Sequence, residues 1–382
     1  MNLDYLNKLT NLAINEHAFP GGVLVSGSSK NPLEITFNFG HHTYDKNSPL
    51  VAIDHYFDLA SLTKVVATTP SIMQLISQNE LLLNDKISKF LSPSWFLDNQ
   101  LKQDIEIIDL LAHCSGFAPC VDAKLILDSN LDLDARWSII KQMPLAYVKR
   151  SKTVYSDIGF IILGRIIEII SKVRLDEFAK EHIFNPLGMK GTTYNPSYLI
   201  SETIPTEFTV DGKLLQGVVH DECCRAIGGI SGHAGLFSSV IDLAKYAQTW
   251  LNSDLSSNLG WGTSDLMDQF KQKANLAPFS TRALGWNTVS IENYNYTINE
   301  QYSAGNYIED SGFGHTGFVG NSIWISPRYD RFVILLTNQV YPKRSEVSLE
   351  IKQYWRNKLT NAIWEILGYT KLNNLPILNK RK

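Results

Sequence analysis

The run ASLTKVVATTPSIMQLISQN, residues 60–79, decides how the rest of this sequence is interpreted. Its apolar residues recur with helical spacing and predict one helix that Pro70 kinks midway. Ser61 and Lys64 stand three residues apart at its start, so a hydroxyl and an amine project from one face. A lysine that burial keeps partly neutral can activate a serine, and a helix N-terminus favours an oxyanion. The stretch therefore predicts a serine nucleophile that attacks an amide or ester.

A Ser-x-x-Lys pair alone is a weak signal, because a chain of this length contains about one by chance. Ser138 and Lys141 form a second copy, and a capping serine with a solvated lysine is the ordinary interpretation of either pair. Tyr155-Ser156-Asp157 supports the first copy. Its phenol could pass a proton to the leaving group and its carboxylate could hold the lysine or the substrate, although a core tyrosine before a capped helix is the alternative.

A third stretch, His315-Thr316-Gly317, precedes a strand-like run at residues 321–326. A glycine lets a substrate approach the edge of a sheet and hydrogen-bond along it. The backbone N–H of Phe318 would then be the second oxyanion donor. For His315 alone, an ordinary imidazole with satisfied hydrogen bonds is the alternative.

Strand and helix patterns predict how these stretches are arranged. Two strand-like runs near residues 23–27 and 33–39 predict a hairpin that opens a sheet, and two more follow at 321–326 and 331–338. Helices are expected near 2–16, 157–170, 239–252 and 345–366, and the middle of the chain is mostly helical in pattern. Sheet segments at both ends with helices between them predict an α/β lobe and an inserted helical lobe.

In the order Ser-x-x-Lys, Tyr-x-Asp and His-Thr-Gly, the three stretches resemble the penicillin-recognising serine hydrolases, the family of class C β-lactamases, DD-peptidases and related esterases. Only Ser61 fits this order and spacing. The resemblance covers nearly the whole chain, and it is closest to the His-Thr-Gly branch with atypical penicillin-binding proteins and muropeptide amidases. Its further landmarks are Phe19–Gly22, Leu110–Gly116, Asn185–Met189, Val219–Asp221, Gly228–Ser238 and Gly314–Gly320.

The resemblance implies an α/β (α+β) fold of the β-lactamase/transpeptidase type, an antiparallel sheet flanked by helices plus an inserted all-helical lobe. One catalytic unit would span residues 1–382, with the α/β lobe at about 1–78 and 226–382 and the helical lobe at about 79–225. Ser61 would be the nucleophile, activated by Lys64 and Tyr155. The expected oxyanion and substrate-binding residues are Phe318, Asp157, His315, Thr316, Gly317 and His233.

The resemblance also implies a small-molecule or peptide substrate and no cofactor. We expect a peptidoglycan-derived peptide, cleaved as by a DD-carboxypeptidase or muropeptide amidase, or a small ester. A true class C-like β-lactamase and a slowly acylated penicillin-binding sensor are the alternatives. Asp157 stands where Asn is commoner, and His315 replaces a lysine whose charge holds the carboxylate of a β-lactam, so efficient β-lactam turnover is not expected. Lys343 or Arg344 could supply that cation, or form a solvated surface pair.

Composition excludes several other classes of function. The 382 residues carry 35 basic and 38 acidic side chains, a net charge of -3, which gives no footprint for nucleic acid or anionic lipid. The four cysteines are expected to be free thiols, and no metal is expected, because the His and Cys spacing around residues 220–233 fits no standard zinc framework. No signal peptide or membrane span is predicted, so the chain as written is expected in the cytoplasm, or in the periplasm or outside the cell if a leader is missing. The oligomeric state stays open.

Overall fold

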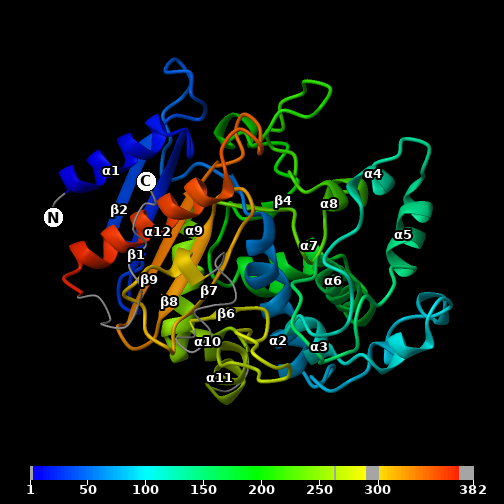
Figure 1. Ribbon diagram of the computed structural model, residues 1–382. Helices are drawn as coiled ribbons and strands as arrows, with labels where there is room; N and C mark the ends of the chain where they lie inside the picture. The colour runs from blue at the N-terminus through cyan, green and yellow to red at the C-terminus, as the bar shows by residue number, and fades with distance from the viewer. Residues whose placement is uncertain (1–2, 262–263, 290–300, 370–382) are drawn as a thin grey trace.

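A six-stranded antiparallel sheet forms one side of the protein, in a computed structural model that describes residues 3–261, 264–289 and 301–369 (Figure 1). The strand order is β2-β1-β9-β8-β7-β6, so strands from the two ends of the sequence meet where β1 pairs with β9. The predicted hairpin and both late strands are confirmed. The bounds are β1 Gly21–Gly27, β2 Ile35–Gly40, β6 Asn287–Thr288, β7 Phe313–Thr316, β8 Ser322–Ser326 and β9 Arg331–Thr337.

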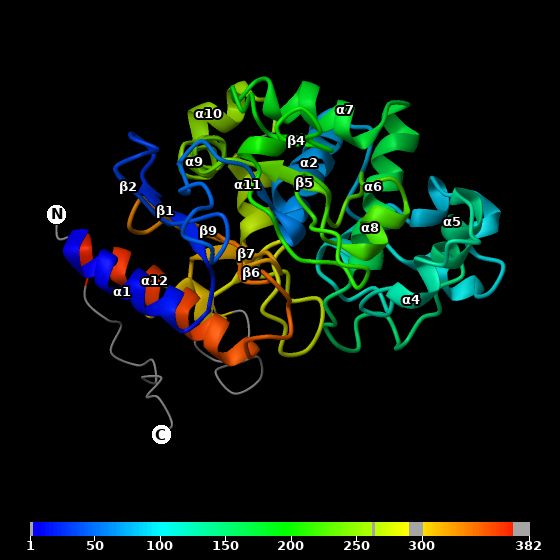
Figure 2. The ribbon, with the colours of Figure 1, turned by 90° about the horizontal axis from the view of Figure 1, so that it is seen from above.

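Helices cover both faces of this sheet, because successive side chains of a strand point to opposite sides. On β1, Val23 and Val25 belong to a hydrophobic cluster shared with α9 (Val240–Leu251), whereas Leu24 belongs to the cluster of α1 (Leu3–Asn15) and α12 (Leu349–Ile366). The helices α1 and α12 lie side by side across one face (Figure 2).

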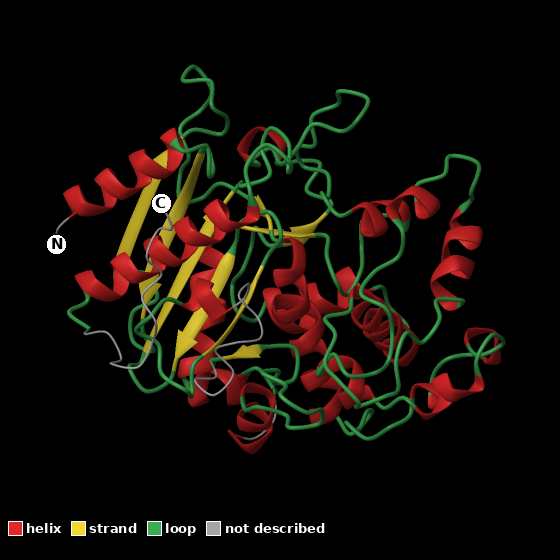
Figure 3. Ribbon diagram, viewed as in Figure 1, coloured by secondary structure: helices red, strands yellow, loops and turns green. Residues whose placement is uncertain are grey.

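In the sequence, the remaining α-helices come after β2 and before β6, and long loops join many of them (Figure 3). A second, three-stranded sheet has the order β3-β5-β4 and joins the start of this segment to its end. Its strands are β3 Phe57–Asp58, β4 Thr193–Tyr194 and β5 Leu236–Ser238. The α-helices are α2 Thr69–Ser77, α3 Ile107–Leu111, α4 Ala123–Ile126, α5 Leu133–Lys141, α6 Asp157–Ser171, α7 Leu175–Ala179, α8 Glu222–Ala226, α10 Ser253–Asn258 and α11 Ser264–Lys271. Shorter turns are η1 Ala60–Leu62, η2 Lys64–Thr68, η3 Ile87–Lys89, η4 Pro93–Trp95, η5 Gln100–Asp104, η6 Lys180–Phe184, η7 Ile200–Glu202 and η8 Gln301–Ala304.

The helix expected over residues 60–79 is three consecutive helical turns of different kinds. A 3₁₀ turn, η1, is followed by a π-helical turn, η2, and the α-helix α2 begins only at Thr69. Pro70 lacks an N–H and its ring clashes with the carbonyl four residues earlier, so the turn ahead of it widens, and the Thr69 N–H donates to the Lys64 carbonyl. The proline acts at the start of α2 and not in its middle.

The predicted fold class is confirmed, with an antiparallel sheet, flanking helices and a helix-rich segment between its strands. The segment 79–225 also contains β4 and extended loops, which the helical pattern did not indicate. The division into two lobes near residues 78 and 225 stays a prediction. No helix within the described ranges has the length and apolar character needed to cross a membrane.

Candidate active site

Ser61 follows a strained turn that a buried carboxylate holds in place. Strand β3 ends at Asp58, which is 1% exposed and whose Oδ1 accepts the Ala60 N–H at 2.8 Å. Ala60 has a φ of 47°, a left-handed conformation that an L-residue adopts at a cost. The carboxylate compensates this cost by fixing the Ala60 N–H, so the chain direction at Ser61 is set by β3.

The amine of Lys64 lies at the centre of the site, and its side chain is completely buried. Its Nζ donates to Ser61 Oγ at 3.0 Å and to the backbone carbonyl of His233 at 3.0 Å, and it lies 2.7 Å from Asp157 Oδ1. An ammonium group has three protons, and these three acceptors match them. The structure therefore brings Ser61, Lys64 and Asp157 together, as the sequence predicted.

Charge at this centre is set by the Lys64–Asp157 pair. Burial lowers the pKa of Lys64, but the negative charge of Asp157 and its contacts with Asp157 and Tyr155 outweigh burial, so the pKa is raised overall. Burial likewise raises the pKa of Tyr155 to about 12, although the neighbouring Lys64 charge partly offsets it. At neutral pH the resting site thus holds an ammonium and a protonated phenol.

Tyr155 lies between the lysine and two histidines. The Lys64 Nζ lies 4.8 Å from the centroid of the Tyr155 ring, and the rings of His113 and His315 lie 4.6 and 5.9 Å from it. His113 Nδ1 accepts the Ser156 N–H at 3.1 Å, which holds the segment that starts α6, and Ser156 is the N-cap of α6. Burial lowers the pKa of His113 far below its usual range, with help from the nearby cations, so this ring is neutral.

The His-Thr-Gly stretch precedes β8, as predicted, and His315 and Thr316 also end a strand of their own, β7, that pairs with β8. A Cβ at Gly317 would lie only 2.6 Å from the carbonyl oxygen of Leu59, so this edge packs directly against the turn that carries Ser61. Within the part of the chain that the structure describes, no acceptor takes the Phe318 N–H. That N–H is therefore available to a ligand at this edge.

His233 contacts Lys64 through its backbone carbonyl. Its ring is 1% exposed and bonds Asp221 Oδ1 at 2.9 Å and Ser231 Oγ at 2.8 Å, while its carbonyl accepts from Lys64. A role of His233 in oxyanion or substrate binding stays a prediction.

The sequence did not identify Arg282, a buried arginine next to the cluster. Its guanidinium carbon lies 5.1 Å from the centroid of the Tyr155 ring, and the residue is 6% exposed. Arg344, one of the two cations that the sequence offers for a substrate carboxylate, forms ion pairs with Glu207 and Glu222, at 2.8 and 2.6 Å. A single arginine in a loop belongs to no residue pattern that indicates a site, so its place next to Tyr155 is known only from the fold.

Of the four cysteines, Cys114 is the one that lies next to His113, and it is not a rival nucleophile. All four are free, and burial, followed by the nearby Asp109, raises the pKa of Cys114 to about 12, which keeps its thiol protonated. Among the described residues, no group of three or more His, Cys, Asp or Glu side chains is arranged to hold a metal ion.

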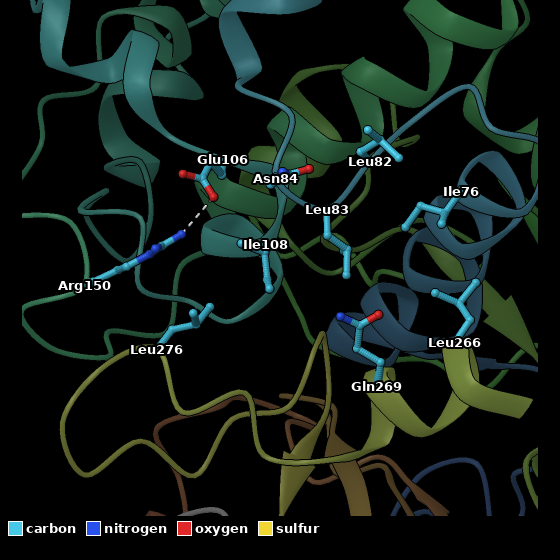
Figure 4. A pocket seen from close by; sticks show the side chains of 10 residues that line it. All are labelled: Ile76, Leu82, Leu83, Asn84, Glu106, Ile108, Arg150, Leu266, Gln269 and Leu276. Carbon is cyan, nitrogen blue, oxygen red and sulfur yellow. Dashed lines mark hydrogen bonds and ion pairs between the residues drawn. The ribbon is translucent and has the colours of Figure 1, made fainter.

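A separate cavity of about 500 Å³ lies at the far end of α2 from Lys64 (Figure 4). It is mainly apolar, with an ion pair between Arg150 and Glu106 at 3.0 Å at one side. It contains none of the candidate site residues and no activated nucleophile, so we place the candidate active site at Ser61. Its lining is Ile76, Leu82, Leu83, Asn84, Glu106, Ile108, Arg150, Leu266, Gln269 and Leu276.

Comparisons with known proteins show what this chain is similar to. A family model described as Beta-lactamase matches residues 17–353. The chain is 33% identical over 308 residues to an N-acetylmuramyl-L-alanine amidase of Bacillus subtilis, covering 74% of this chain and 68% of the amidase. It is 31% identical to a putative D-alanyl-D-alanine carboxypeptidase of Escherichia coli, covering 74% and 69% of the two chains.

Two solved structures share the fold. The octameric penicillin-binding protein homologue of Pyrococcus abyssi has a TM-score of 0.71 at 21% identity, covering 98% of this chain and 80% of its own. EstCE1, a hydrolase with promiscuous acyltransferase activity, has a TM-score of 0.72 at 18% identity, covering 94% and 98%.

Proposed function

The chain belongs to the β-lactamase family, and from this premise we propose that it is a serine hydrolase that works through an acyl-enzyme intermediate at Ser61. The observation that carries the proposal is the 3.0 Å contact between Ser61 Oγ and the buried Lys64 Nζ. A nucleophilic serine needs a proton acceptor within hydrogen-bond reach, and Lys64 lies at that distance and can accept the proton once the ammonium has lost one of its own.

In the acylation step, Ser61 Oγ forms a bond to the carbonyl carbon of the substrate. Its proton passes to the Lys64–Tyr155 pair, and the bond to the leaving amine or alcohol breaks as the pair returns the proton to that group. The N–H groups of Ser61 and Phe318 hold the oxyanion. Water then attacks the ester at Ser61 and releases the acid.

The reactive form of this pair must first lose a proton, because Lys64 has a raised pKa and that of Tyr155 is about 12. A base is useful only in the fraction of molecules where it is deprotonated. We therefore expect kcat/KM to rise with pH through and above neutrality.

The substrate that we propose is a peptidoglycan-derived peptide or amide, or a small ester of similar shape. Support comes from relatives named amidase and carboxypeptidase. Esters are included because a serine nucleophile that attacks an amide carbonyl can also attack an ester carbonyl. Arg282 beside Tyr155 is the cation that we assign to a carboxylate of the substrate.

The test combines labelling with one substitution. We expect intact-mass spectrometry to detect one covalent adduct with a fluorophosphonate, mapped to Ser61, and Ser61→Ala to lose the adduct and several orders of magnitude of turnover. Ser138→Ala removes the serine of the second Ser-x-x-Lys pair and serves as the matched control. Full turnover by Ser61→Ala would disprove the proposal.

A further inference from the structure

The side chain of Phe318 is 53% exposed, directly after the Thr316-Gly317 edge. Single exposed phenylalanines are common, so exposure alone means little. Here two side chains lie against the ring. The His220 ring lies with its centroid 5.8 Å away and tilted by 26°, and the guanidinium carbon of Arg344 lies 5.5 Å from the ring centroid.

Both side chains lie on the same side of the ring. Groups centred over opposite faces would be separated by about the sum of those two distances, whereas Arg344 Nη2 is only 3.2 Å from His220 Nε2. One side of the Phe318 ring is therefore covered, and its exposed surface belongs to the other side.

The covered side is rigidly held. His220 is 3% exposed, and its Nε2 bonds Glu207 at 2.7 Å, while Glu207 also accepts the N–H and Nε of Arg344 at 2.7 and 2.8 Å. The His220 N–H donates at 2.6 Å to Asp58, the carboxylate that fixes the turn before Ser61. The ring is thus anchored to the framework of the nucleophile, so binding on it requires little further ordering.

The chemistry of the open face favours an uncharged group. The electron-rich π system already attracts the Arg344 cation from the covered side, which leaves the opposite face a poor site for a second cation. An aromatic ring also offers no hydrogen bond to an anion. An aliphatic chain or a ring with an apolar face gains the most from such a surface.

We propose that the open face of Phe318 is a substrate-binding platform that selects substrates with an uncharged apolar group beside the scissile bond. The inference rests on the proposed function and names the substrate group that this end of the site recognises. It concerns the side chain of Phe318 and is separate from the oxyanion role of its N–H.

Two ester series test the platform and locate the group. One varies the acyl part of p-nitrophenyl esters through acetyl, hexanoyl and 3-phenylpropionyl, and the other varies the alcohol of acetate esters in the same way. In one of the two series, we expect Phe318→Ala to lower the preference by about five- to tenfold. In the acyl series this is the preference for a large acyl group over acetyl, and in the alcohol series it is the preference for a large alcohol over a small one. A ratio of kcat/KM values is used because uniform damage to the oxyanion site cancels from it.

Two further variants separate the platform from a structural effect. Phe318→Tyr should keep the wild-type preference, and Arg344→Gln, which removes one of the supports, should lower it in the same direction as Phe318→Ala but less. Equal loss for every ester in Phe318→Ala would overturn the proposal, as would unchanged ratios in both series. If the wild type hydrolyses no ester and Ser61 takes no adduct, the proposed function fails together with the platform; if the wild type is active and labelled, only the platform is at stake.

Discussion

Replacing Asp157 with Asn removes the charge that holds Lys64 as an ammonium while keeping the shape of the side chain. The two groups are 2.7 Å apart, which gives a gross attraction of about 6 kcal/mol at an effective dielectric of about 20. Desolvation offsets much of it, and losing one partner of a buried pair costs about 3–5 kcal/mol. Because Asp157 is 22% exposed and Lys64 can release its proton, we expect Asp157→Asn to lower the free energy of unfolding by about 2–3 kcal/mol at pH 7.

The same substitution should change the pH dependence of catalysis in a known direction. Asp157 raises the pKa of both Lys64 and Tyr155, so its loss lowers both. The rising limb of kcat/KM against pH must therefore move to lower pH, and each unit of movement raises the rate tenfold at any pH on the limb.

A pH-rate profile from pH 5 to 11 with p-nitrophenyl acetate measures this shift, and urea unfolding measures the stability. Asp104→Asn is the matched control, because it removes an equally close partner of an exposed lysine, Lys86, at 2.6 Å. Its rising limb should coincide with that of the wild type. A limb that stays in place or moves to higher pH in Asp157→Asn would refute the assignment of Lys64 and Tyr155 as the proton acceptors.

Three further predictions concern stability and packing. Burial raises the pKa of Glu207, but hydrogen bonds from His220 and Arg344 outweigh burial and lower it from 4.5 to about 2. Glu207 therefore contributes about 3 kcal/mol to the free energy of unfolding. This contribution is present above pH 4.5 and is lost as the pH falls towards 2. Acid unfolding followed by circular dichroism should therefore flatten over this range in Glu207→Gln, and an unchanged curve would contradict the pairing. Gly317→Ala places a Cβ 2.6 Å from the Leu59 carbonyl oxygen. We therefore expect kcat/KM to fall by about a hundredfold or more and the free energy of unfolding to fall by about 1–3 kcal/mol. Wild-type kinetics in this variant would show that the contact between Gly317 and Leu59 is looser than described. Cys114→Ala should keep kcat/KM within about threefold of wild type and lower the free energy of unfolding in urea by about 1 kcal/mol, because the thiol is buried. A large loss of rate would implicate the thiol in catalysis.

Local sequence patterns predicted the parts of the site that depend on local structure. Ser61 and Lys64 were expected to lie one helical turn apart, and Tyr155 just before a helix, because both arrangements follow from spacing of a few residues. The hairpin β1–β2 and the strands β8 and β9 have clear periodicity and were found in the same way.

Features that depend on distant parts of the chain could not be predicted. The two-residue strands β3 and β4 are too short to show a period, and they exist only because β5 pairs with both. Arg282 reaches Tyr155 across 127 positions of sequence, and no local pattern marks this arginine. The widened turn before Pro70 appears only when the geometry of the helix is known. The contact of the His233 backbone carbonyl with Lys64 was not predicted either, because residue type carries no signal for a main-chain contact.

The pairing of β1 with β9 also constrains how the protein is made. Residues 21–27 leave the ribosome early, but their partner strand at residues 331–337 follows only after about three hundred more residues have been translated. Until then the hairpin β1–β2 is marginally stable alone, and β1 presents an open edge that can pair with other chains. Nascent chains that stall before β9 should therefore be the form most prone to aggregate and most dependent on chaperones.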